Sequence, residues 1–192
     1  MLYIICAFEA EARALIDVYK LVKKQSEPFA LFESNEIKLL ICKMGQQNAK
    51  EACQYLSQHY NLKKEDKLLN LGICAAQEKY STGSILLVKN LSNEYISHEL
   101  QTIDSNLTEV SCYSSAQVLD KPSKSDIAEM EALAIYETLS IYFTKENISF
   151  LKIVSDNFKP FKPSKQFIID LIKGNLKEIQ DHITQLIGNA HV

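Results

Sequence analysis

Five carboxylates stand where short segments of this sequence change character, and they are the residues best suited to chemistry. Glu9 and Glu11 follow the apolar run "LYIICAF", and Asp156 ends the run "ISFLKIVSD". Glu129 and Glu131 lie two residues apart in the stretch "SDIAEMEALAIYETLSIYF". Grouped carboxylates can act as general acid and general base, and they can stabilise positive charge that develops during a reaction.

Each of these residues also has a structural explanation. Acidic side chains in the first turn of a helix complement the positive end of the helix dipole, which would account for the four glutamates. Asp156 is compatible with an N-cap or a turn, and Met130 is compatible with the core. The chemical interpretation therefore depends on whether the fold brings these side chains together.

Short apolar runs alternate with amphipathic segments along the whole chain. We predict strands over 2–8, 29–34, 37–44, 67–75, 83–93, 110–119 and 148–156, and helices over 9–22, 48–60, 125–143 and 164–188. Asn48 is the expected N-cap of the second helix, Ser125 or Asp126 that of the third, and Gly174 a possible bend in the last. The polar stretch 94–109 is expected to form loop and edge structure.

This alternation predicts an α/β fold: one domain over 1–192, with a mixed, mostly parallel central sheet flanked by helices. In open α/β sheets, ligands bind beyond the carboxyl ends of the strands. Acidic residues recur at those positions in this sequence. The pattern therefore favours a common site for them.

Composition argues against several classes of protein. A net charge of −3 without a basic cluster makes nucleic acid a poor candidate partner. No apolar run approaches the length of a membrane span, and "MLYIICAF" lacks the charged segment of a signal peptide, so we expect a cytoplasmic protein without a membrane partner. The five cysteines form no CxxC pair and are expected to be buried free thiols. The histidines show no ligand spacing, so no metal is expected.

Three motifs occur in a recognisable order: "AFEAEA" at 7–12, "EMEA" at 129–132 and "VSD" at 154–156. Together they resemble the nucleoside phosphorylase superfamily, and within it the methylthioadenosine/S-adenosylhomocysteine nucleosidases. The resemblance covers most of the chain, including "KMGQQNA" and "NLGICAA". It implies that fold, hydrolysis of the N-glycosidic bond of a purine nucleoside related to methylthioadenosine, no cofactor, and a homodimer.

The resemblance also implies a role for each matching residue. Asp156 would protonate the purine at N7, and Ser155 would orient Asp156. Glu131 would accept hydrogen bonds from the ribose 2′- and 3′-hydroxyls while Met130 packs against the sugar. Glu11 would activate the attacking water, a task for which we expect a carboxylate of ordinary pKa.

Further residues are candidates for substrate contact. Glu129 is included among the substrate-binding residues because it belongs to the same motif. Tyr113 and Phe158 are nominated for contact with the base, although each is equally compatible with a core position. Asn157 is another candidate for the base, although "SDN" is also typical of a plain turn.

The residues themselves favour hydrolysis over phosphorolysis. Cleavage of an N-glycosidic bond builds positive charge on the ribose, which nearby carboxylates stabilise. Phosphorolysis instead needs cationic groups that bind a phosphate dianion, and this chain has a single arginine, Arg13. Glu9 and Glu11 would repel phosphate, and Arg13 suits a helix surface or an interface.

The sequence departs from the family pattern at several points. Ile73 replaces a small hydroxyl residue, Gln117 stands where a phenylalanine is usual, and the chain is shorter than typical members between Glu94 and Asp126. Two alternatives to the hydrolase therefore remain open. One is a protein of this fold that binds a nucleoside or base without catalysis, and the other is a scaffold whose carboxylates only start helices.

Overall fold

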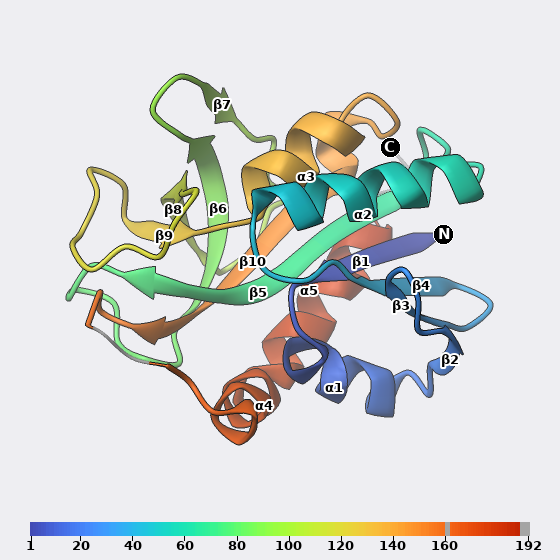
Figure 1. Ribbon diagram of the computed structural model, residues 1–192, viewed down its shortest axis with the longest axis horizontal. Coiled ribbons are helices and arrows are strands. Elements are labelled where there is room, and N and C mark those ends of the chain that lie inside the picture. Colours follow the sequence, from blue (N-terminus) through green and yellow to red (C-terminus); the bar gives the residue numbers. More distant parts are fainter. Residues whose placement is uncertain (160–161, 189–192) are drawn as a thin grey trace.

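The computed structural model describes residues 1–159 and 162–188 (Figure 1). Its strands are β1 (Leu2–Cys6), β2 (Val22–Gln25), β3 (Ala30–Glu33), β4 (Ile37–Ile41), β5 (Lys67–Ala76), β6 (Ile85–Ser92), β7 (Ser97–Glu99), β8 (Thr108–Ser114), β9 (Ile127–Glu129) and β10 (Ile148–Asp156). Its helices are α1 (Glu9–Val18), α2 (Gln46–His59), α3 (Ala132–Leu139), α4 (Lys165–Gly174) and α5 (Leu176–Gly188), with a short 3-10 helix, η1 (Lys145–Asn147), before β10.

The strands of the described residues form one mixed sheet, as predicted. Its order is β10-β6-β8-β9-β5-β1-β4-β3-β2, and β7 pairs with β6. The neighbours β4, β1, β5 and β10 run parallel to one another, whereas β2, β3 and β4 form an antiparallel edge. The predicted hairpin of β3 and β4 across Asn35 and Glu36 is confirmed.

Part of the sheet closes on itself. Strand β10 pairs with both β5 and β6, and β8 and β9 complete a ring that returns to β5. The strands of this ring curve round at the left of Figure 1. Because a closed ring leaves no unpaired edge among its members, even the three-residue strand β9 is held on both sides.

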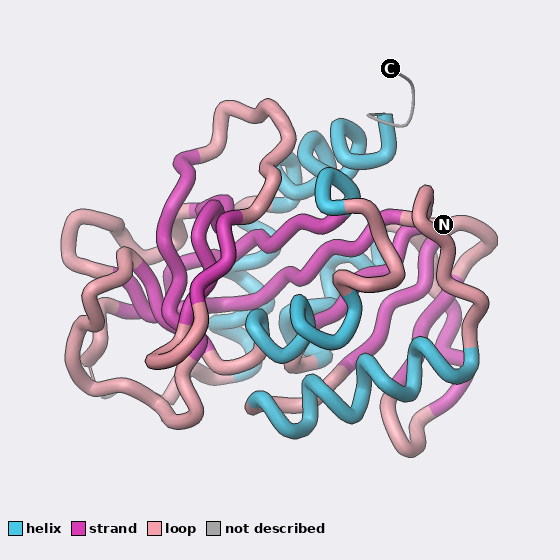
Figure 2. Tube along the Cα trace, turned by 90° about the horizontal axis from the view of Figure 1, so that it is seen from above, coloured by secondary structure: helices cyan, strands magenta, loops and turns pink. Residues whose placement is uncertain are grey.

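Helices cover both faces of the sheet (Figures 1 and 2). Helices α2 and α3 pack on one face and share a core with alternate strand residues such as Ile5 and Leu68. Helices α1, α4 and α5 pack on the other face, against residues such as Ile4 and Leu69. This alternation is the two-residue period of a strand that is buried on both sides.

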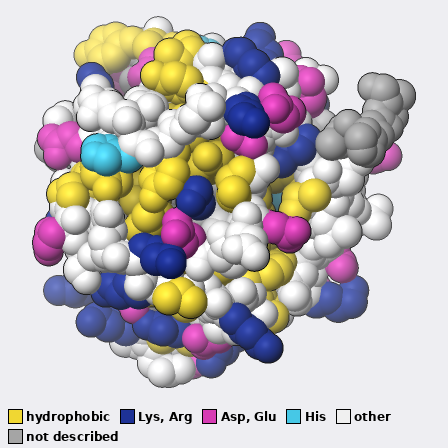
Figure 3. Space-filling model, turned by 90° about the vertical axis from the view of Figure 1, so that its right-hand side faces the viewer, with side chains coloured by type: hydrophobic (Ala, Val, Ile, Leu, Met, Phe, Trp, Pro, Cys, Tyr) yellow, Lys and Arg dark blue, Asp and Glu magenta, His cyan; other side chains and the backbone are white. Residues whose placement is uncertain are grey.

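Three features expected from composition can be compared with the structure: the cysteines, the surface charge and the absence of a membrane span. All five cysteines are buried and free, as predicted. Charged side chains of both signs are intermingled on the face that Figure 3 shows. No helix within residues 1–159 and 162–188 has the length and apolar character needed to cross a membrane.

The segment 125–143 is not one helix, contrary to the sequence-based prediction. Residues Ile127–Glu129 form β9, and α3 begins only at Ala132. Strand pairing overrides the helical pattern here, because β9 bonds to Ala75 and Ala76 of β5 and to 112–114 of β8. Neither Ser125 nor Asp126 is therefore a helix cap.

Two other helix boundaries differ from the prediction. Helix α2 begins at Gln46 and not after Asn48; its N-cap is Gly45, whose φ of 99° favours glycine. The predicted last helix is divided into α4 and α5 at Asn175. The Asn175 side-chain amide donates to the Leu171 and Gly83 carbonyl oxygens, which ties the break to the loop before β6.

Candidate active site

A cavity of about 1000 Å³ opens at the carboxyl ends of β1, β5 and β10. The start of α1, the end of β9, the segment 115–120 and the start of α4 complete its lining. All five carboxylates singled out in the sequence line it: Glu9, Glu11, Glu129, Glu131 and Asp156. The five carboxylates therefore meet at the carboxyl ends of the strands, where ligands bind in open α/β sheets.

Glu11 lies in the first turn of α1 with only 2% of its surface exposed. Its Oε2 accepts hydrogen bonds from the backbone N–H groups of Ala7 and Phe8, both at 2.9 Å. Its Oε1 accepts one from the backbone N–H of Ile73 at 2.9 Å. A carboxylate has about four acceptor positions, so one remains for a ligand or a water.

Glu131 is the N-cap residue of α3 and is 8% exposed. Its Oε1 accepts a 2.6 Å hydrogen bond from the backbone N–H of Gly45, at the start of α2. Its Oε2 has no hydrogen-bond partner among the described residues, and the side chain lines the cavity together with Met130 and Met44. Glu131 thus presents a carboxylate oxygen beside two flexible apolar side chains.

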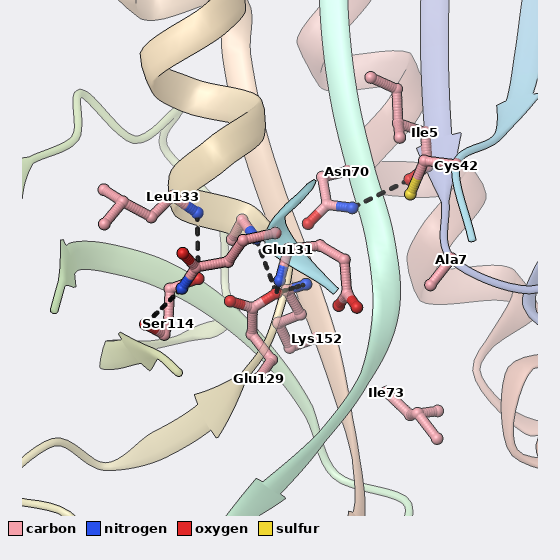
Figure 4. A network of polar contacts seen from close by, with 12 residues as sticks. Ile5, Ala7, Cys42, Asn70, Ile73, Ser114, Glu129, Glu131, Leu133 and Lys152 are labelled. Atoms are coloured by element: carbon pink, nitrogen blue, oxygen red, sulfur yellow. Dashed lines mark hydrogen bonds and ion pairs between the residues drawn. The ribbon is translucent and has the colours of Figure 1, made fainter. Parts of the chain in front are cut away.

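Glu129 forms a buried ion pair with Lys152 of β10 (Figure 4). The Lys152 Nζ lies 2.9 Å from Glu129 Oε2, and the exposed fractions of the two side chains are 2% and 1%. The same oxygen accepts hydrogen bonds from the backbone N–H groups of Glu131 and Ala132. Glu129 therefore stabilises the start of α3, which agrees in part with its structural explanation.

Asp156 ends β10 just after an irregularity in the pairing with β5. Val154 pairs with Cys74 and Asp156 with Ala75, so Ser155 is an extra residue in β10. Such a bulge re-aims the side chains that follow it. The Ser155 Oγ lies 2.7 Å from Asp156 Oδ2 and 3.0 Å from the Cys74 carbonyl oxygen, so its proton can be donated to either.

Burial and mutual repulsion shift the pKa values of the carboxylates that line the cavity. Burial, with the charge of Glu129, raises the pKa of Glu131 to about 7. Burial also raises the pKa of Glu11, despite its three backbone hydrogen bonds and the nearby Lys152, so the expectation of an ordinary pKa is wrong. Burial is the largest single influence on Glu129 and would raise its pKa, but the charge of Lys152 and the hydrogen bonds that Glu129 accepts together outweigh burial, and the pKa is lowered.

Several other candidates lie outside the cavity. Tyr113 and Phe158, nominated for contact with the base, are not among the residues of the described ranges that line it. Tyr113 alternates along β8 with the buried Cys112 and Ser114, and so points to the opposite side of that strand. Phe158 is 4% exposed, in a left-handed backbone conformation with φ of 57°.

Asn157, Glu9 and Arg13 have structural partners. The Asn157 amide nitrogen lies within hydrogen-bond distance of three carbonyl oxygens, those of Ala76, Gln77 and Tyr80, which supports the turn interpretation. Glu9 and Arg13 form a half-exposed ion pair along α1 at the edge of the cavity. Arg13 is therefore a helix-surface residue, one of the two positions expected for it.

Sequence reasoning missed two residues on which the site depends. A lysine within the apolar run "ISFLKIVSD" was a visible signal, because a lysine in a buried strand needs a partner, and Lys152 has one in Glu129. Gly72 gave no such signal. A Cβ at Gly72 would lie 3.1 Å from Glu11 Oε1 and 3.6 Å from Lys152 Nζ, so a side chain there would force the Glu11 carboxylate to shift by a few tenths of an ångström.

We predict that Gly72→Ala lowers the free energy of unfolding by about 1–3 kcal/mol, because the new methyl group shifts the Glu11 carboxylate by a few tenths of an ångström and weakens its hydrogen bonds. Gly174→Ala is the matched control, since a Cβ there meets nothing within 4 Å. Denaturant titration of both variants measures the difference. Equal stability of Gly72→Ala and wild type would contradict the close approach of Glu11 to Gly72.

Known proteins resemble this chain in fold but not in sequence. No family model matches the sequence, and no curated protein sequence matches it. Among solved structures, Helicobacter pylori 5′-methylthioadenosine/S-adenosylhomocysteine nucleosidase in complex with butyl-thio-DADMe-Immucillin-A has a TM-score of 0.78 at 12% identity, over 95% of this chain and 97% of that one. Arabidopsis thaliana 5′-methylthioadenosine nucleosidase has a TM-score of 0.74 at 14% identity, over 99% and 95%.

A third structure, futalosine hydrolase of Helicobacter pylori, has a TM-score of 0.77 at 12% identity, over 95% of this chain and 96% of that one. The resemblance inferred from the three motifs is therefore confirmed at the level of the fold. The chain therefore shares its fold with these two nucleosidases and with futalosine hydrolase.

Proposed function

We propose that this protein hydrolyses the N-glycosidic bond of a purine nucleoside related to methylthioadenosine, releasing the free base and the ribose moiety. The observation that carries the proposal is the convergence of Glu11, Glu131 and Asp156 on one cavity. They arrive from three separate elements, α1, the start of α3 and the end of β10. The relatives in fold named above include nucleosidases and a hydrolase, which supports this reaction class.

In the proposed reaction, Glu131 holds the ribose. Its free Oε2 would accept hydrogen bonds from the 2′- and 3′-hydroxyls, and Met130 would pack against the sugar. As the bond to the base breaks, positive charge develops on the ribose. The buried glutamates Glu11, Glu129 and Glu131, when ionised, outnumber Lys152, the buried cation beside them, so the cavity stabilises this charge more than it stabilises the neutral substrate.

Glu11 would accept a proton from the attacking water. Three backbone N–H groups fix its orientation, so little reorganisation is needed when the water reacts. The raised pKa of Glu11 helps in this role, because a carboxylate with a higher pKa is a stronger base near neutral pH. The proton of the water passes to Glu11, and the hydroxyl oxygen forms the new bond to the ribose carbon.

Asp156 would supply the proton that the leaving base needs. Its Oδ2 is held by Ser155 at 2.7 Å, whereas its Oδ1 has no hydrogen-bond partner among the described residues. A protonated Asp156 could donate to N7 of the purine, so that the base leaves as a neutral molecule. Water, two carboxyl groups and fixed charges suffice for the reaction, and no cofactor or metal enters it.

We predict that Asp156→Asn lowers the rate of base release by about 10²–10⁴-fold, because an amide cannot donate the proton. The fold should be retained, since Ser155 can still donate to the amide oxygen. Asp120→Asn is the matched control, because Asp120 is an exposed acid that also lines the cavity. Chromatography of free purine after incubation with methylthioadenosine measures the rate, and a wild-type rate in Asp156→Asn would refute the assignment.

Two further parts of the proposal concern assembly and compartment. We propose a homodimer, as the resemblance implies, and exposed apolar side chains at the cavity edge such as Met44 and Val118 suit coverage by a second copy. We propose a cytoplasmic location because five buried free thiols suit a reducing compartment. Sedimentation of purified protein as a monomer at all concentrations would contradict the dimer.

A further inference from the structure

We infer that Lys152 is a positioning residue for the proposed reaction: through Glu129, its ammonium fixes both the place and the charge environment of Glu131. This inference rests on the function proposed above. It concerns a side chain that is not among the described residues lining the cavity but pairs with Glu129, which does line it (Figure 4).

One carboxylate oxygen joins β10 to the start of α3. Glu129 Oε2 accepts the Lys152 Nζ at 2.9 Å, the Glu131 backbone N–H at 2.9 Å and the Ala132 backbone N–H at 2.8 Å. The last two groups belong to the turn that carries the Glu131 side chain. A displaced Glu129 would therefore move the carboxylate proposed to hold the ribose.

The ammonium also lies close to Glu11. The position that a Cβ of Gly72 would take is 3.6 Å from Lys152 Nζ and 3.1 Å from Glu11 Oε1. The absence of a side chain at Gly72 therefore leaves room for the Glu11 carboxylate, while the ammonium lies at ordinary contact distance from the same position. Lys152 thus lies beside carboxylates from two different walls of the cavity.

The titratable groups that interact with Lys152 come from several of the elements packed around it, although β6, which pairs with β10 at Lys152, supplies none. They are Glu11, Glu129, Glu131, Cys6, Cys74 and Cys112. Burial raises the pKa of all three thiols, so they stay neutral near pH 7. The charge balance is therefore set by three glutamates against one lysine.

The sign of each perturbation follows from this balance. Burial and the charge of Glu129 raise the pKa of Glu131, and Lys152 lowers it. Loss of the ammonium should raise that pKa further, whereas loss of the Glu129 charge should lower it. Glu131 must be ionised to stabilise a cationic ribose, and Glu11 must be ionised to accept the proton of the water. A change in the pKa of Glu131 should therefore move the acid limb of the pH–rate profile.

The test is kcat/KM for base release from methylthioadenosine as a function of pH. For wild type we expect the acid limb near pH 7, the pKa of Glu131. Lys152→Met should move the limb upward by about one pH unit, a loss of about tenfold on its acid side. Glu129→Gln should move it downward by a similar amount, and Lys152→Arg should restore the wild-type position.

A purely structural role would not produce shifts of opposite sign. Lys67→Met is the control for loss of a buried lysine, because Lys67 is 5% exposed and bonds to Asn147, away from the cavity. The acid limb of the pH profile of Lys67→Met should stay at the wild-type position. If Lys152→Met does not fold, the double variant Glu129→Gln/Lys152→Met is compared with Glu129→Gln, and its limb should lie higher. If the acid limbs of Lys152→Met and Glu129→Gln do not move, or if both move in the same direction, the inference is overturned. Failure of the wild type to release a base would instead overturn the proposed function.

Discussion

Three carboxylates buried around one cavity would cost free energy if nothing compensated them, because taking an unpaired charge out of water costs several kcal/mol. Hydrogen bonds and one ion pair offset this cost, and they determine how the elements around the cavity are arranged. Backbone N–H groups from the β1–α1 turn and from β5 surround Glu11, the backbone N–H of Gly45 binds Glu131, and Lys152 pairs with Glu129. The carboxyl ends of the strands and the starts of α1, α2 and α3 are thereby tied to one another through the site.

Structural and chemical explanations of these residues therefore do not exclude each other. Glu129 caps the first turn of α3, as an acidic helix starter would, and the same oxygen holds the ammonium of Lys152. Glu11 binds the backbone at the start of α1 and also lines the cavity. The hydrogen bonds and the ion pair do not fully offset the cost of burying these carboxylates, since the pKa values of Glu11 and Glu131 stay raised. Such residual destabilisation of buried acids is typical of sites that move protons.

The sequence was informative about the cavity at the ends of two strands. Glu11 and Asp156 were predicted to share a site because local apolar runs mark the ends of β1 and β10, and both residues line the cavity. Strand β9 was missed because three residues carry no periodic signal, and its pairing with β5 and β8 is a long-range effect. Tyr113 was misjudged because the face to which a strand residue points depends on its register. Gly72 could not be recognised, since its importance is the space it leaves.

The central claim is that water, held by a buried carboxylate, attacks the ribose of a purine nucleoside. The most direct measurement is purine release by the wild-type protein from methylthioadenosine, S-adenosylhomocysteine, adenosine and inosine in isotopically labelled water, with and without phosphate. The account predicts release that is independent of phosphate, with the label in the sugar product. Release only with phosphate, or no release from any of the four nucleosides, would contradict it.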